Sequence, residues 1–221
     1  MAKSLDLEEQ EQLDQIKHFW KRYGNLITWG LTVVFAAIAA WNGWNYWQHQ
    51  QAQSASVLFD EVERSVAAKD ASRTDRALTD LQNQYGRTAI AHQGALLAAQ
   101  GLWESGDQAK AKAALEWAAG KDTDKGLQAI ARLRLAGLAM DAGAPDEAAK
   151  WLAGPFDPAF EGLAADRLGD MHRMAGRIAE AKQAYLRAHT LLGAETDYRR
   201  LVEVKLNALG AQPPAAERSA L

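Results

Sequence analysis

Residues 168–188 read LGDMHRMAGRIAEAKQAYLRA, and this stretch decides the fold. A helix-forming run precedes Gly176 and an Ala-rich run follows it, so the glycine marks a turn between two helices. Small or apolar residues recur at helical spacing on both sides of the turn, at Leu168, Gly169, Ala181, Tyr185 and Ala188. Small side chains let paired helices approach, while a Tyr fills the space between them. The stretch therefore predicts two closely packed antiparallel helices.

The same pattern occurs twice more upstream, with turns at Gly143 and Gly106. A period in the thirties is the signature of a helix-turn-helix array. The matching positions are Leu135, Ala136, Ala148 and Leu152 in one copy, and Ala98, Ala99, Leu102, Ala111, Leu115 and Ala118 in the other. Each copy resembles a tetratricopeptide (TPR) unit, but Ala replaces most helix-A aromatics and Gly154-Pro155 interrupts the second helix of the middle copy. One repeat cannot bury its own face, so we expect the copies to stack.

The array extends in both directions. Upstream we predict a degenerate helix pair that turns near Lys69, with apolar positions at Val57, Leu58, Val62, Ala77, Leu78, Leu81 and Tyr85. Downstream, a helix around residues 197–209 is predicted to cap the array, and residues 211–221 to form a flexible tail. Abundant Ala and only 5 Pro indicate an all-α fold. An Ala-rich helical bundle without superhelical stacking remains the alternative.

Towards the N-terminus, residues 26–47 read LITWGLTVVFAAIAAWNGWNYW, and no Asp, Glu, Lys or Arg occurs between Arg22 and Asp60. As a helix with a rise of about 1.5 Å per residue, this stretch is roughly 33 Å long, which matches a hydrocarbon core of about 30 Å. Aromatic residues cluster at both ends, where rings prefer the headgroup layer, at Trp20, Tyr23, Trp41, Trp44, Tyr46 and Trp47. The sequence therefore predicts a transmembrane helix.

Basic residues set the orientation of this helix. Lys17, Lys21 and Arg22 precede the span, and no Lys or Arg follows it until Arg64, so the positive-inside rule keeps the N-terminus in the cytoplasm and exports the rest. The predicted divisions are a cytoplasmic segment (1–22), a transmembrane helix with interfacial ends (23–48), a periplasmic TPR-like domain (49–210) and the tail (211–221). A signal peptide cleaved near Ala37-Ile38-Ala39 and a buried soluble helix are weaker alternatives.

The residues that usually carry chemistry form no recognisable site. The chain has no cysteine, its 5 histidines include no H-E-x-x-H pair, and no P-loop or nucleophile elbow is present. A net charge of -3 with both signs mixed argues against a nucleic-acid partner. We therefore expect no enzyme activity, no cofactor and no metal.

Two binding surfaces are predicted instead. The first helices of TPR units line a groove that receives partner segments. By register, the groove residues are Leu96, Gln100, Trp103, Leu133, Gly137, Met140, Asp166, Asp170 and Arg173, although Trp103 and Met140 could equally be core residues. Within the span, a face of small residues would allow another transmembrane helix to approach closely, at Ala36, Ala39, Ala40 and Gly43.

Taken together, the leader ending in Ile16-Lys17-x-Phe19-Trp20, the uncharged span closing with Trp44-x-Tyr46-Trp47, and the degenerate repeats resemble the YfgM family across essentially the full chain. This resemblance implies an ancillary subunit of the SecYEG translocon in the inner membrane of Gram-negative bacteria. It implies as partners the translocon, the periplasmic chaperone PpiD and newly exported proteins. The alternative is a TPR scaffold that assembles an envelope machine, such as pili or outer-membrane complexes.

Overall fold

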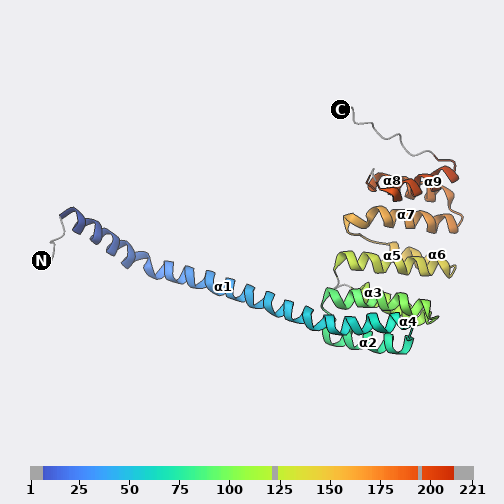
Figure 1. The fold of residues 1–221 in the computed structure, drawn as a ribbon. Helices are drawn as coiled ribbons and strands as arrows, with labels where there is room; N and C mark the ends of the chain where they lie inside the picture. The colour runs from blue at the N-terminus through green and yellow to red at the C-terminus, as the bar shows by residue number, and fades with distance from the viewer. Residues whose placement is uncertain (1–6, 121–123, 194–195, 212–221) are drawn as a thin grey trace. The chain divides into compact units, whose positions relative to one another are not determined.

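The computed structural model describes residues 7–120, 124–193 and 196–211, with side chains from residue 17 onward. Over these ranges the chain is helical and contains no strand, which confirms the all-α prediction (Figure 1). The helices are α1 (Leu7–Ala67), α2 (Ala71–Tyr85), α3 (Ala89–Glu104), α4 (Gln108–Ala118), α5 (Lys125–Asp141), α6 (Pro145–Leu152), α7 (Pro158–Met174), α8 (Ile178–Leu191) and α9 (Asp197–Ala208). Of the predicted tail (211–221), only Ala211 is among the described residues.

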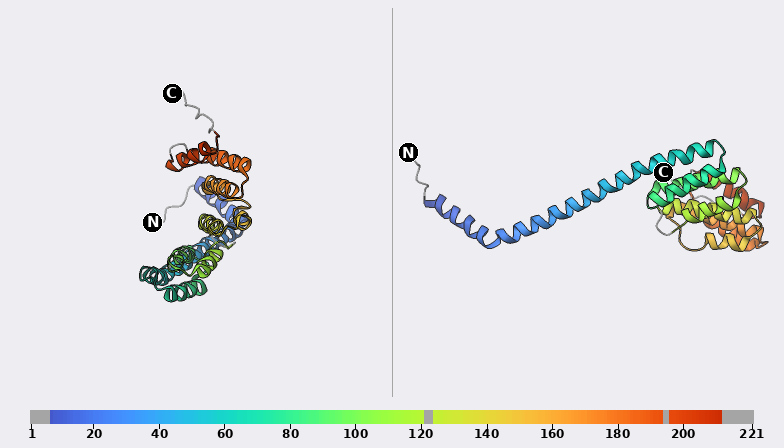
Figure 2. Two further views of the ribbon diagram at one scale, coloured as in Figure 1. Left: turned by 90° about the vertical axis from the view of Figure 1, so that its right-hand side faces the viewer. Right: turned by 90° about the horizontal axis from the view of Figure 1, so that it is seen from below.

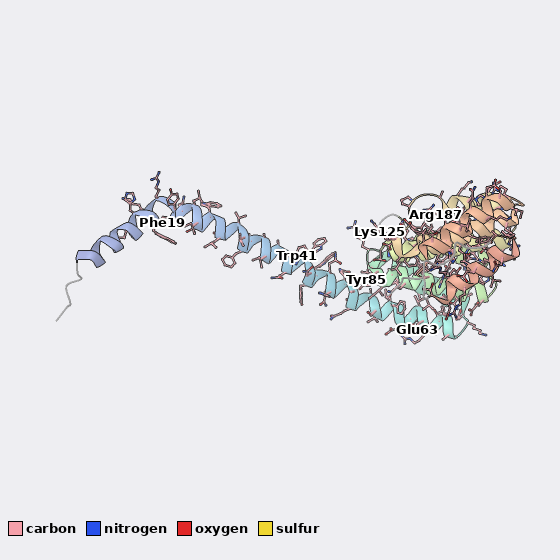
Figure 3. All side chains as sticks on the ribbon, turned by 90° about the horizontal axis from the view of Figure 1, so that it is seen from above. Phe19, Trp41, Glu63, Tyr85, Lys125 and Arg187 are labelled. Carbon is pink, nitrogen blue, oxygen red and sulfur yellow. The ribbon has the colours of Figure 1, made fainter. Side chains whose placement is uncertain are left out.

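The chain divides into two compact units between Gln51 and Ala52. The first unit contains the apolar part of α1, whose large side chains are exposed, among them Phe19 and Trp41 (Figure 3). From Lys17 onward α1 is long and apolar enough to cross a membrane, and its most apolar window is only 6% buried. This exposure contradicts the alternative of a buried soluble helix.

Two threonines in this apolar stretch satisfy their hydroxyl groups within the helix. Thr28 Oγ1 donates to the carbonyl of Gly24, and Thr32 Oγ1 donates to the carbonyl of Thr28, each at 2.8 Å. A hydroxyl that bonds to the backbone four residues earlier needs no other partner in a lipid environment. These polar residues are therefore compatible with a membrane span.

The second unit is a stack of antiparallel helix pairs, as the repeat pattern predicted (Figures 1 and 2). The C-terminal turns of α1 share a hydrophobic cluster with α2, and Arg73 of α2 donates to Glu61 of α1 at 2.6 Å. The pairs α3/α4, α5/α6 and α7/α8 follow, before α9. Buried small and apolar residues of successive pairs form the core, including Val62, Leu81, Leu102, Leu135 and Tyr185. The structure is therefore a TPR-like solenoid rather than a plain bundle.

The predicted turn glycines share one backbone geometry. At Gly143 the φ angle is +71°, its N–H donates to the carbonyl of Met140 at 2.8 Å, and the next N–H, of Ala144, donates to Ala139 at 2.8 Å. These two bonds define the Schellman motif, which satisfies the free carbonyls at a helix end. Gly106 and Gly176 repeat the arrangement. The turn before α2 uses Lys69 instead, which lies at φ +55°.

Close packing within the last pair depends on a missing side chain. A Cβ atom on Gly169 of α7 would lie 2.5 Å from the ring of Tyr185 on α8, which is far inside van der Waals contact. The fully buried Tyr185 ring occupies that space. The repeat pattern predicted that small residues let the two helices approach and that a Tyr fills the space between them. In the structure the Tyr185 ring packs against the bare backbone of Gly169.

The irregular connection after α6 is held by one arginine. Arg132 of α5 donates from Nε to the carbonyl of Trp151 at 3.1 Å, from Nη1 to that of Pro155 at 2.8 Å, and from Nη2 to that of Ala153. Its guanidinium also lies 3.9 Å from the centroid of the Phe156 ring. Partial burial lowers the pKa of Arg132, but its charge is retained. Arg132 therefore supplies hydrogen bonds to the carbonyl groups around Gly154-Pro155, where α6 has ended.

Lys69→Gly should raise stability. A residue with a Cβ pays about 1 kcal/mol for left-handed backbone that glycine adopts freely. The midpoint of thermal unfolding, followed by circular dichroism on the full chain in detergent, should rise. Gly143→Ala is the matched control and should lower the midpoint, because it places a Cβ at φ +71°. A lower midpoint for Lys69→Gly would show that φ is not positive there.

Candidate partner-binding groove

An open cavity of about 420 Å³ lies among α3, α4, α5 and α7. Its apolar walls are the side chains of Ala99, Ala111, Leu115 and Leu138 together with Trp103, which is 37% exposed. Its polar lining residues are Gln100, Arg134, Asp141 and Arg167. An apolar pocket with a few polar groups is the usual form of a binding site.

Gly137 leaves this cavity open on the side of α5. It is one of the lining residues, and a Cβ atom built on it would meet nothing within 4 Å. Its missing side chain therefore contributes free volume to the cavity, unlike Gly169, whose missing side chain is replaced by Tyr185.

A second cavity, of about 260 Å³, also borders Trp103. It shares Trp103, Leu138 and Asp141 with the first and adds Lys112 of α4 and Glu147 of α6, whose side chains form an ion pair at 2.6 Å. Trp103 thus lines both cavities. We refer to the two cavities together as the groove.

The structure brings only some of the predicted groove residues to this surface. Gln100, Trp103 and Gly137 line the first cavity. Leu96 and Met140 are buried in the core, and Leu133 packs against the cluster that contains Met140. The polar lining residues that the sequence prediction missed are Arg134, Asp141 and Arg167. A repeat pattern identifies the buried faces of helices and does not show where polar side chains reach.

The predicted acidic pair on α7 is bound within the chain. Lys205 Nζ of α9 lies 2.8 Å from both carboxylate oxygens of Asp166 and 2.9 Å from Oδ2 of Asp170. Tyr198 donates its hydroxyl to Asp166 and Tyr185 donates to Asp170, each at 2.7 Å. The side chain of Asp166 is completely buried. A partner could therefore reach Asp166 only by displacing α9, whereas Arg173 is exposed.

The two tyrosines remain good donors in this network. Burial raises the pKa of Tyr185, and its hydrogen bond to Asp170 adds to the effect. Burial and the hydrogen bond to Asp166 likewise raise the pKa of Tyr198. Both hydroxyl groups therefore stay protonated at neutral pH and continue to donate hydrogen bonds to the two carboxylates.

The predicted packing face on α1 is present as an exposed surface. Ala36, Ala39, Ala40 and Gly43 are all exposed, and a Cβ atom on Gly43 would meet nothing within 4 Å. Nothing in the chain covers this face among the described residues. Packing against another helix stays a prediction.

Known proteins match this chain over both the apolar helix and the repeats. A family model described as a tetratricopeptide repeat-like domain matches residues 17–211. A protein of Neisseria gonorrhoeae named "Ancillary SecYEG translocon subunit" is 28% identical over 206 residues, which cover 92% of this chain and 98% of that protein. Proteins of the same name from Aggregatibacter actinomycetemcomitans and Haemophilus influenzae are each 27% identical, with the same coverage. The resemblance inferred from the sequence is thereby confirmed.

Lys205→Met should destabilise the C-terminal pair strongly. It leaves the carboxylate of Asp166 buried without its cation, and removing one partner of a buried ion pair typically costs about 3 kcal/mol or more. The measurement is the thermal unfolding midpoint of the full chain in detergent. As a matched control, Arg187→Met removes a cation whose contact with Glu161 is long, at 3.9 Å, and solvent-exposed. That change should cost less than about 1 kcal/mol, and equal effects of the two substitutions would contradict the burial of Asp166.

Proposed function

Because the chain belongs to the tetratricopeptide repeat-like family and is similar over most of its length to ancillary SecYEG translocon subunits, we propose that it is itself such a subunit. In this role it is a membrane-anchored, non-catalytic binding module. It presents its groove to proteins that leave the translocon and passes them to periplasmic chaperones, of which PpiD is the candidate. The observation that carries the proposal is that the match extends over both the apolar helix and the repeats.

The anchor supports this function through its position and its charge pattern. The exposed apolar part of α1 fits a bilayer, and Lys17, Lys21 and Arg22 stand on one side of it only. By the positive-inside rule, these residues stay in the cytoplasm and the solenoid is periplasmic. The exposed face around Ala39 is available for a helix of the translocon or of a partner chaperone.

Anchoring also explains why an open groove is sufficient. A binding module tethered beside a channel exit meets its partners at a high effective concentration, so weak contacts can be occupied. The groove offers weak contacts of this kind, since it is open and only partly apolar. Weak binding lets a client leave quickly, as a transfer between the channel and a chaperone requires.

Site-specific photocrosslinking tests the proposal. A photoreactive amino acid at Ala39 should yield adducts with translocon subunits or with a membrane-anchored chaperone. The same group at Gln100, which is exposed and lines the groove, should capture an exported protein arrested during translocation. Thr79, exposed on α2 and absent from the groove lining, is the control and should give few adducts.

Two results of this experiment would argue against the proposal. If no position yields a translocon adduct, the chain is not a translocon subunit. If Gln100 is crosslinked to components of pili or outer-membrane complexes instead, the scaffold alternative is correct.

Cysteine labelling tests the orientation. The chain has no cysteine, so each introduced cysteine is unique. A membrane-impermeant maleimide should label Gln108→Cys, an exposed position on α4, in intact spheroplasts. His18→Cys, exposed before the span, should be labelled only after lysis. The reverse pattern would overturn the proposed topology, and the loss of residue 18 from the mature protein would show that the span is a cleaved signal.

A further inference from the structure

The rim of the first cavity carries more positive than negative charge. Its charged lining residues are two cations, Arg134 and Arg167, and one anion, Asp141. Arg167 forms a long ion pair with Asp170, with 4.0 Å between Nη1 and Oδ2. Asp170 already accepts hydrogen bonds from Tyr185 and Lys205 at 2.7 and 2.9 Å, so it compensates Arg167 only weakly.

Arg134 is held in place by an uncharged group, and within the described part of the chain no carboxylate forms an ion pair with it. Its Nη1 atom donates to the carbonyl of Leu96 at 2.9 Å, which anchors the guanidinium at the wall between α3 and α5. A guanidinium has five N–H donors, and a carbonyl accepts one of them and brings no charge. The positioned Arg134 therefore keeps donors and a full charge for a ligand.

We propose that this cavity recognises a short extended polypeptide segment in which a bulky apolar side chain is followed by a carboxylate. The proposal rests on the proposed function, since it names the chemistry that the groove selects in a client. The apolar side chain enters between Trp103 and Leu138, and the carboxylate binds at Arg134 and Arg167.

The size of the cavity fits this ligand. Its volume of about 420 Å³ is at the lower end of ligand pockets, which range over about 300–1,000 Å³. Small lining residues, Ala99 and Ala111, and the bare Gly137 make the room. A Phe or Leu side chain with its adjoining backbone can be accommodated there.

The charge of the rim selects the neighbouring group. Charge-assisted hydrogen bonds from guanidinium to carboxylate are roughly twice as strong as neutral ones. A segment with Lys in place of the acid would place like charges together, and Asp141, at the C-terminal end of α5, opposes only part of that repulsion. The cavity should therefore prefer an acidic over a neutral segment, and a neutral over a basic one.

Peptide binding to the full chain in detergent micelles tests the proposal. The probe is a fluorescein-labelled hexapeptide amide, Ser-Gly-Phe-Glu-Gly-Ser, measured by fluorescence anisotropy. Replacing its Glu by Gln should weaken binding by about tenfold at low salt, and the difference should shrink as salt screens the charges. Replacing its Phe by Ala should weaken binding to a similar degree.

Variants of the chain locate the site. Gly137→Leu fills the cavity from a position with no neighbour and should abolish binding while helicity and unfolding midpoint are kept. Arg167→Gln should reduce the preference for the Glu peptide over the Gln peptide, because only Arg134 then remains to bind the carboxylate, and Asp141→Asn should strengthen binding of the Glu peptide. Arg76→Gln removes the same charge from an exposed position of α2 and should change nothing.

The outcomes separate this inference from the proposed function. Equal binding of the Glu, Gln and Lys peptides, or undiminished binding to Gly137→Leu, overturns the inference even if translocon adducts form at Ala39. Binding that is lost in Gly137→Leu, together with a preference for Glu that is reduced in Arg167→Gln, supports it even if no translocon adduct is found.

Discussion

The solenoid depends on one constraint: no helix pair of this chain can bury its apolar face alone. In the α7/α8 pair the two helices come close because Gly169 of one lies against the large Tyr185 side chain of the other. The remaining apolar surface must then be covered by the next pair. The core, the shared turns and the groove between successive pairs all follow from that requirement.

Much of this was predictable from the sequence, for a physical reason. The turn glycines and small residues recur because backbone geometry and close approach admit few alternatives there, so Gly106, Gly143 and Gly176 identify the helix pairs directly. The first pair was also found, although Lys69 stands at its turn. The helical spacing of its apolar residues was sufficient to predict the two helices.

Side-chain networks were not predictable in the same way. Arg132 binds carbonyls about twenty residues ahead, and Lys205 reaches two carboxylates on another helix. Such contacts depend on three-dimensional placement and not on periodicity. For this reason the sequence identified Gln100, Trp103 and Gly137 in the groove but missed its arginines. It also gave no sign that Asp166 forms an ion pair with Lys205 of α9.

The position of the cavity within the stack also affects which motions it experiences. In an array whose units contact only their neighbours, the end units fray first and the inner ones exchange their amide protons last. The cavity is assembled from α3, α4, α5 and α7, and none of its lining residues belongs to α9. Transient detachment of the last helix would consequently leave the walls of the cavity assembled, so the cavity stays formed even when the array is not fully closed.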